Sequence, residues 1–110
     1  MIQAMVKMDF APQTIHEALQ ILHSIVERTR AEAGCISCSV YRDMENEHLF
    51  VFEETWRSEE ALQHHLRSED YRKVLLVMEM AITPPVIRFD TITDTGGVEV
   101  IVDARSKTKE

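Results

Sequence analysis

The sequence lacks the features of several specialised classes of protein. No apolar run approaches the length of a membrane span, so we expect no membrane-spanning helix. Residues 1–10 contain no basic segment ahead of an apolar one, so we expect no secretory signal and place the protein in the cytoplasm. No internal repeat or low-complexity segment interrupts the 110 residues, of which 45% are hydrophobic. These totals predict one globular domain.

Basic residues are also scarce relative to acidic ones. Twelve Lys and Arg side chains stand against nineteen Asp and Glu, for a formal net charge of −7. Nucleic acids and anionic membranes are bound by basic surfaces. The composition therefore excludes both as expected partners.

Cys35 and Cys38 are the two cysteines, and they form a C-x-x-C motif. In thioredoxin-like proteins this motif opens a helix, but here it lies in a run typical of a β-strand. Side chains three apart on a regular strand point to opposite faces, which disfavours a disulfide between them. Two cysteines are too few for a structural zinc site without suitably spaced histidines. We predict two buried, reduced thiols.

Two strand-like runs, Cys35–Arg42 and Leu49–Trp56, form the centre of the chain. Both are rich in β-branched and aromatic residues, and the polar segment between them predicts a hairpin. Ser58 then offers a side-chain oxygen to cap a helix. A second cap at Ser68 splits the helical stretch 59–82 into two helices near Arg67.

The flanking segments complete the pattern. Alternating apolar residues predict a strand over residues 2–10, and helical spacing predicts a helix over 13–32. Thr14 and Glu17 fit a capping box at its start, and Gly34 suits a left-handed helix end. We predict further strands over 86–93 and 98–103, a domain spanning 1–104, and a charged tail over 105–110.

The first seven elements have the order of a ferredoxin-like split β-α-β subunit, which is an α+β fold with helices on one face of an antiparallel sheet. The strands nevertheless carry apolar side chains on both faces, because Val51 and Tyr41 oppose Phe52 and Val40. A monomer would expose the second face as a large apolar patch. We therefore predict a homodimer that pairs through the sheet faces.

Three segments together resemble the antibiotic biosynthesis monooxygenase family of small dimeric α+β-barrel proteins. They are GCISCSVYRD, FVFEETW and EALQHHLRSEDY, within residues 1–93. The positions that carry the resemblance are Gly34, Cys35, Tyr41, Arg42, Glu53, Glu54, Trp56 and His65. The resemblance implies a dimeric barrel with a pocket between sheet and helices. It also implies oxidation of phenols or quinols by dioxygen without metal or flavin, or, in a related branch, haem degradation.

The chain departs from the family pattern in three places. Cys38 stands where the family often has an aromatic residue, and Asp70 where it often has a second histidine. The haem-degrading branch has an asparagine on its first strand, and residues 3–8 contain none, which disfavours haem degradation.

The candidate site residues follow from these segments. His65 has an unperturbed pKa near neutrality and is the predicted catalytic base; a half-buried structural histidine is the alternative. Trp56 and Tyr71 can line a pocket with it, or only pack. Arg88 needs a partner, either a carboxylate such as that of Glu54 or a substrate oxyanion. We predict that Trp56, Tyr71, Arg88 and Phe52 bind a small aromatic substrate.

The resulting functional hypothesis is a monooxygenase that needs no cofactor and no metal. A deprotonated quinol or hydroxyaromatic can pass an electron to dioxygen directly, in a dry pocket with fixed hydrogen bonds. The alternative hypothesis is a non-catalytic module on the same dimeric fold that binds a small ligand or serves in interactions, because one fold hosts many functions. The sequence does not name the substrate.

Overall fold

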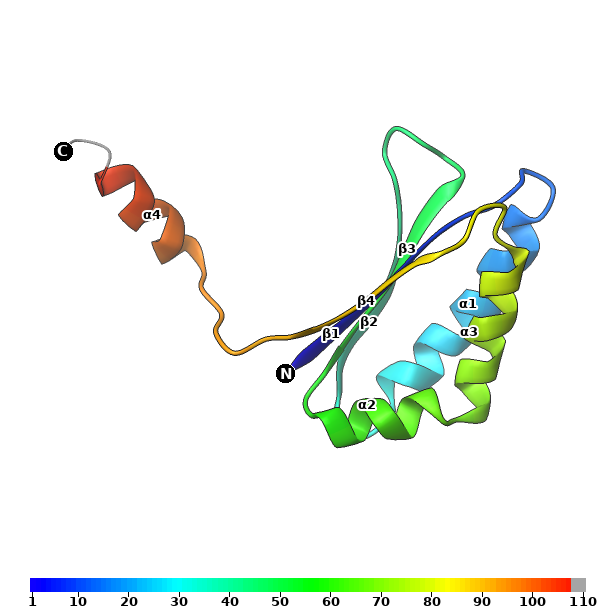
Figure 1. Ribbon diagram of the computed structural model, residues 1–110, viewed down its shortest axis with the longest axis horizontal. Helices are drawn as coiled ribbons and strands as arrows, with labels where there is room; N and C mark the ends of the chain where they lie inside the picture. The colour runs from blue at the N-terminus through cyan, green and yellow to red at the C-terminus, as the bar shows by residue number, and fades with distance from the viewer. Residues whose placement is uncertain (108–110) are drawn as a thin grey trace.

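The protein is described by a computed structural model over residues 1–107. A four-stranded antiparallel sheet has the order β2-β3-β1-β4, and three helices cover one of its faces (Figure 1). The fold is the expected α+β, ferredoxin-like one. In chain order the elements are β1 (Ile2–Asp9), α1 (Ile15–Arg30), β2 (Cys35–Arg42), β3 (Leu49–Trp56), α2 (Glu59–Leu66), α3 (Glu69–Met80), β4 (Val86–Thr91) and α4 (Val98–Lys107).

The central hairpin and two of the predicted helix caps are confirmed. β2 and β3 have the predicted bounds and pair antiparallel. The Ser58 hydroxyl accepts a hydrogen bond from the backbone N–H of Ala61, and that of Ser68 accepts one from Tyr71. These side chains satisfy N–H groups that have no partner within their own helix, and so define where α2 and α3 begin.

The capping box predicted at Thr14 is wrong. Thr14 is the N-cap of α1, but its hydroxyl donates to the carbonyl of Ala11 instead of accepting from the helix. Local hydrogen bonding of this kind competes with capping for the same side chain.

The strand predicted over residues 98–103 is also wrong, because this segment forms the helix α4. Alternating valines favour a strand only if another strand is there to pair with them. The Glu99 carboxylate instead accepts a hydrogen bond from the backbone N–H of Gly97 and lies in the first turn, with Arg105 and Lys107 in the last. This charge order suits the helix dipole. The predicted boundary at residue 104 falls within α4, and residues 108–110 of the predicted tail lie outside the described residues.

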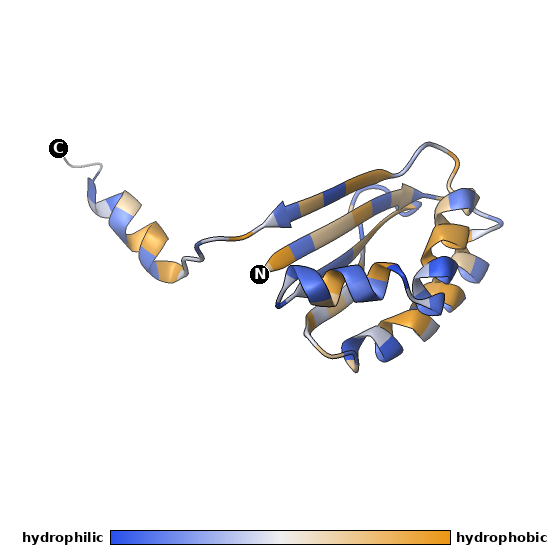
Figure 2. Ribbon diagram, turned by 60° about the horizontal axis from the view of Figure 1, so that its bottom comes forward, coloured by the Kyte–Doolittle hydropathy of each residue, from blue (hydrophilic) through white to orange (hydrophobic). Residues whose placement is uncertain are grey.

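The core fills the space between the sheet and helices α1 and α3. From the sheet it receives the side chains of alternate residues, including Val6, Met8 and Phe52. Hydropathy colouring shows apolar positions gathered on the sides of these helices that face the sheet (Figure 2). This one-sided packing leaves the opposite sheet face uncovered within the subunit. On that face Met5 and Val51 are half-buried, whereas Tyr41 is 54% exposed.

A β-bulge near the start of β2 changes the orientation of its first residues. Cys35 lies opposite Trp56 and Cys38 lies opposite Glu54, with a register shift between Cys35 and Ser37. Directly opposed residues share a sheet face, and Trp56 and Glu54 are two apart on one strand. Both cysteines therefore lie on the helix-covered face, which corrects the expectation that they oppose each other. Both are free thiols, Cys38 buried and Cys35 partly so.

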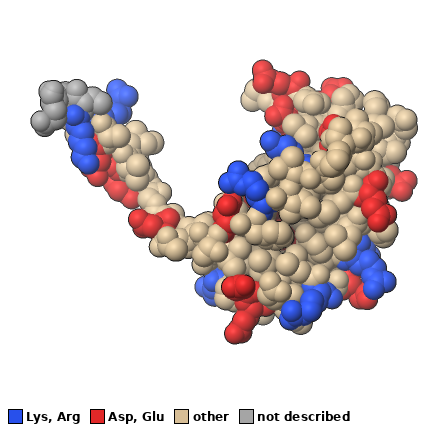
Figure 3. Space-filling model, viewed as in Figure 1, with Lys and Arg blue, Asp and Glu red and all other residues tan. Residues whose placement is uncertain are grey.

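α4 stands away from the rest of the subunit (Figures 1 and 2), and none of its residues is buried. Among residues 1–107, no helix is both long enough and apolar enough to cross a bilayer. On the face seen in Figure 3, Lys and Arg are interspersed with Asp and Glu, so this view shows no continuous basic surface for a polyanion.

Candidate functional site: a buried histidine between two carboxylates

His65 is held at both ring nitrogens by carboxylates. Its Nδ1 lies 2.7 Å from Oε2 of Glu32, and its Nε2 lies 2.7 Å from Oε2 of Glu54. The histidine is fully buried and Glu54 is 1% exposed, whereas the Glu32 side chain is 22% exposed. The array therefore runs from the protein interior at Glu54 to the surface at Glu32.

Three separate elements bring these groups together. Glu54 lies on the buried face of β3, between Phe52 and Trp56 in the alternation of that strand. His65 lies in the last turn of α2, one turn after the buried Leu62, so the residues that pack the helix on the sheet also bury the imidazole. Glu32 follows the end of α1.

Gly34 fixes the approach of α2 to the start of β2. Its φ is +86°, in the left-handed region predicted for it, and a Cβ there would overlap the side chain of Ala61. Its carbonyl accepts a 2.7 Å hydrogen bond from the backbone N–H of Arg57, just after β3. A side chain at position 34 would thus push away the helix that carries His65.

Two aromatic residues enclose the imidazole. The ring centroids of Trp56 and His65 are 4.6 Å apart, and Tyr71 meets His65 edge-on with centroids 5.3 Å apart. The indole N–H of Trp56 donates to Oε1 of Glu54 at 3.2 Å. Both oxygens of Glu54 are therefore hydrogen-bonded, as a buried carboxylate requires.

The carboxylates set the protonation of the histidine. Burial by itself lowers the pKa of His65, but the hydrogen bond and charge of Glu54, with the charge and hydrogen bond of Glu32, raise it above its ordinary value. Burial and then the Glu54 charge raise the pKa of Tyr71 to about 12. At neutral pH Tyr71 is therefore a neutral phenol that can donate a hydrogen bond.

The arrangement has the parts of a carboxylate–histidine pair. A carboxylate on one ring nitrogen fixes the tautomer and stabilises the imidazolium, which leaves the other nitrogen to exchange a proton. Glu54 is placed for the first role because it is buried and held by Trp56. Glu32, as the more exposed carboxylate, occupies the nitrogen at which exchange would take place.

The structure brings together three of the predicted site residues and separates the others. The rings of Trp56, His65 and Tyr71 pack directly on one another, so a substrate cavity among them stays a prediction. Phe52 lies in the core on the same sheet face.

Arg88 lies elsewhere, and its predicted pairing with Glu54 is wrong. It is opposite Met5, on the uncovered sheet face, and its guanidinium pairs with Asp90 at 3.1 Å. Glu54 is unavailable to Arg88 because it lies on the helix-covered face and is bonded to His65 and Trp56.

Sequence reasoning missed the roles of Glu54 and Glu32. The signal for Glu54 was present, since it alternates with Phe52 and Trp56 and a carboxylate on the buried face of a strand needs a partner. Glu32 gave no comparable signal, because it follows a helix end between Ala31 and Ala33, where an exposed carboxylate is ordinary. Within residues 1–107, no cluster of three or more His, Cys, Asp or Glu side chains is arranged to hold a metal ion.

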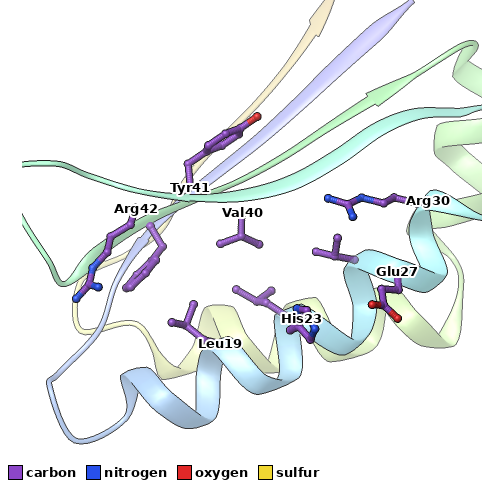
Figure 4. Close-up of a pocket in the computed structure, with 10 residues that line it drawn as sticks. Leu19, His23, Glu27, Arg30, Val40, Tyr41 and Arg42 are labelled. Carbon is purple, nitrogen blue, oxygen red and sulfur yellow. The ribbon is translucent and has the colours of Figure 1, made fainter.

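A separate cavity of about 390 Å³ lies between α1 and β2 (Figure 4). Its apolar lining comes from Leu19, Leu22, Val26, Val40 and Phe50, and its polar lining from His23, Glu27, Arg30, Tyr41 and Arg42. None of the predicted site residues lines it. The cavity adjoins the same sheet face as Glu54. Cys38 lies opposite Glu54, and Val40 and Arg42 follow Cys38 at alternate positions of β2, so all of them share that face.

The chain is similar to known proteins in both sequence and structure. Residues 1–75 match the sequence model of the family described as "Antibiotic biosynthesis monooxygenase". A curated relative, the uncharacterized protein sll1783 of Synechocystis, is 29% identical over 85 residues, which are 76% of this chain. This chain spans 58% of the length of that relative.

Two solved structures share the fold. A conserved protein from Methanosarcina mazei is 28% identical, with a TM-score of 0.76 over 81% of this chain and 89% of its own. Rv0793 from Mycobacterium tuberculosis is 24% identical, with a TM-score of 0.78 over 87% of this chain and 98% of its own.

Proposed function

Because the chain belongs to the antibiotic biosynthesis monooxygenase family, we propose that it is a cofactor-independent monooxygenase that oxidises a quinol or hydroxyaromatic with dioxygen. The observation that supports this proposal is the buried Glu54–His65–Glu32 array enclosed by Trp56 and Tyr71. It combines a proton acceptor of tuned pKa with aromatic surfaces, which are the groups that oxidation of an acidic aromatic needs.

The proposed reaction begins with proton transfer. A substrate hydroxyl displaces Glu32, whose side chain is 22% exposed, from Nδ1 of His65. Glu32 carries the Nδ1 proton away to solvent, and the neutral His65 that remains accepts the substrate proton at Nδ1 while Nε2–H donates to Glu54. Because carboxylate contact favours the imidazolium, Glu54 stabilises the charge that develops on the ring. Tyr71 can donate a hydrogen bond to the resulting substrate anion, since its own proton is retained.

In the later steps the substrate anion reacts directly with dioxygen, and no protein group forms a covalent bond to either. The electron-rich anion transfers one electron to dioxygen, and the organic radical and superoxide combine to a peroxide. Loss of water leaves one oxygen atom in the product, so a CH₂ group and O₂ yield a carbonyl and H₂O. The protein contributes a site from which bulk water is excluded, since Trp56, His65 and Glu54 are each at most 1% exposed.

Oxygen uptake with a panel of quinols and hydroxyanthrones tests the proposal. The protein should accelerate uptake above the buffer rate, and His65→Gln should remove the acceleration. His64→Gln is the matched control, because His64 is the exposed neighbour on the same helix. Acceleration that survives in His65→Gln would overturn the role of His65, and no acceleration with any substrate would overturn the oxygenase.

We also propose that the active form is a homodimer paired through the uncovered sheet faces. The half-buried Val51 and Met5 and the exposed Tyr41 support this proposal, because they form an apolar strip on that face beside the charged Lys7, Glu53 and Arg88. A second copy laid on the strip would remove it from water, which is the main driving force for stable association.

One observation favours a second function, the binding of a small ligand without catalysis. The cavity between α1 and β2 falls in the size range of small-molecule sites and has apolar walls with a few polar groups. The residues that line this cavity are not those of the His65 array, so the two functions can be tested separately.

A further inference from the structure

The cavity between α1 and β2 has arginines near its two ends (Figure 4). Each uses its Nε to hold a backbone carbonyl: Arg30 donates to Cys38 at 2.8 Å, and Arg42 donates to Glu47 at 3.0 Å. These bonds orient the two guanidinium groups and leave their terminal amino groups for other partners. Within residues 1–107, no carboxylate forms a salt bridge with either arginine.

In the part of the chain that the structure describes, neither arginine is neutralised by a carboxylate in a salt bridge, although the protein is acidic overall. The chain has nineteen acidic side chains to twelve basic ones, so carboxylates were available to pair with both. A guanidinium presents its donors in a planar fork that matches a carboxylate. The cavity therefore offers an apolar chamber with a fixed anion-binding group at its rim.

The two arginines are not equivalent. Arg30 shares the rim with Glu27, three residues earlier on α1, and this carboxylate opposes the binding of an anion there. Arg42 lies at the other end, with its guanidinium carbon 5.5 Å from the ring centroid of Phe50. Contact with the aromatic ring and the Glu47 carbonyl holds the guanidinium beside the apolar lining. The turn after Arg42 also carries acidic residues, of which Asp43 accepts hydrogen bonds from the backbone N–H groups of Glu45 and Asn46. We take Arg42 as the anion ligand because it alone of the two arginines is held against an aromatic ring of the lining.

We propose that this cavity binds an aromatic monocarboxylate, with the carboxylate on Arg42 and the rings between α1 and β2. Leu22, Val26 and Phe50 are buried and form the inner wall against which the rings pack. Tyr41 points away from α1, on the other side of the strand, and leaves the chamber open (Figure 4). A volume of about 390 Å³ suits a molecule of one or two rings.

This inference rests on the second proposed function, ligand binding, and is independent of oxygen chemistry at His65. It assigns that function a ligand class and a place. Oxygen uptake by the unchanged protein tests the oxygenase, and carboxylate binding tests this site, so that either can fail while the other stands.

Calorimetric titration with 2-naphthoate, and with its uncharged isostere 2-naphthamide, tests the proposal at pH 7. Naphthoate should bind at least tenfold more tightly than the amide, and the preference should weaken with added salt. Arg42→Gln should remove the preference. Arg57→Gln, which makes the same charge change at an exposed position after β3, should retain it. Arg30→Gln should reduce naphthoate affinity less than Arg42→Gln does.

Backbone amide shifts locate the binding. Naphthoate should perturb residues 19–30 of α1 and residues 40–50, from the end of β2 through the turn to the start of β3, and leave Glu54 and His65 unperturbed. Equal affinity for naphthoate and the amide, a preference that survives Arg42→Gln, or shifts centred on another part of the subunit would each overturn the proposal.

Discussion

Nε2 of His65 lies 2.7 Å from Oε2 of Glu54, and neither residue is more than 1% exposed. A buried imidazole and a buried carboxylate stabilise each other only as a pair, since either alone carries a large desolvation cost. Trp56 adds a hydrogen bond to the same carboxylate. This pair links the stability of the fold to the chemistry of the site, because changing one member alters both.

Replacing Glu54 with Gln should lower the free energy of unfolding by about 2 kcal/mol, the usual worth of a hydrogen bond to a charged group. It should also lower the pKa of His65, because Glu54 supplies the largest contributions that raise it. Urea unfolding and an NMR titration of the histidine ring measure the two effects.

Glu53→Gln is the control for this change. Glu53 is the adjacent residue on β3 and points to the uncovered sheet face. Its substitution by Gln therefore removes the same charge from β3 without changing a residue that contacts His65. A His65 pKa that is unchanged in Glu54→Gln, or equally lowered in Glu53→Gln, would contradict the assigned pairing.

The raised pKa of His65 predicts that stability depends on pH. The folded protein holds the proton more tightly than the unfolded chain, so the stabilisation is fully present below the unfolded value of about 6.5. It is lost as pH rises through the folded pKa. Denaturant midpoints of the native protein should therefore fall as the pH rises from the unfolded value through the folded pKa, and those of His65→Gln should fall less. His64→Gln, at the exposed neighbour, should behave like the native protein; an identical pH profile in all three would refute the linkage.

The fold was largely predictable because its signals are local. The β-branched and aromatic runs define β2 and β3, the hydroxyls of Ser58 and Ser68 define the starts of α2 and α3, and Gly34 defines a left-handed turn. α4 was mispredicted because the alternation of Val98, Val100 and Val102 is a local pattern. It carries no information on whether a neighbouring strand exists to pair with these residues. The facing of the cysteines was mispredicted because a bulge adds a residue that no side-chain pattern marks.

The site was predictable only in part. Trp56, His65 and Tyr71 lie at element ends that the fold brings together, and the structure places their rings in contact. The partners of His65 come from a residue after α1 and from the middle of β3, 33 and 11 positions away. Such pairings depend on how α2 lies on the sheet, and that is set by packing across the core. Glu54 was the wrong carboxylate to suggest for Arg88, because the register of β4 on β1 puts Arg88 on the opposite sheet face.

A negative charge on the uncovered sheet face should dissociate the proposed dimer. Val51→Glu places a carboxylate in the half-buried middle of that face, opposite Lys7, where pairing would bury both charges at a large desolvation cost. Light scattering at micromolar concentration should report twice the monomer mass for the native protein and the monomer mass for the variant. Leu75→Glu makes a similar change at a 48% exposed position on α3 and should stay dimeric. A native monomer at this concentration would refute the dimer.

The two thiols should react slowly in the folded protein. Burial, then the charges of Glu54 and Glu32, raises the pKa of Cys35, and burial followed by the Glu54 charge raises that of Cys38 to about 12. Because the thiolate is the reactive form, a disulfide reagent should label Cys38 more slowly than Cys35 at pH 8, and both should react at once in denaturant. Mass spectrometry of protein from a reducing cytoplasm should show both reduced, and a Cys35–Cys38 disulfide would contradict this.

Gly34→Ala should disturb the site without touching any of its residues. The φ of +86° disfavours a side chain, and the new Cβ would overlap the side chain of Ala61 on α2. We expect unfolding to become easier by about 1–3 kcal/mol, with the strain in the left-handed region as one part and the overlap as the other.

The double variant Gly34→Ala with Ala61→Gly separates the two parts, because it removes the overlap and keeps the strained φ. Since α2 carries His65, relief of the overlap should return the histidine ring signals toward their native positions, although stability recovers only in part. Glycine inside a helix itself costs about 1 kcal/mol, so Ala61→Gly alone is the reference for that cost. Ring signals that are native in Gly34→Ala would show that the contact between Gly34 and Ala61 does not set the position of His65.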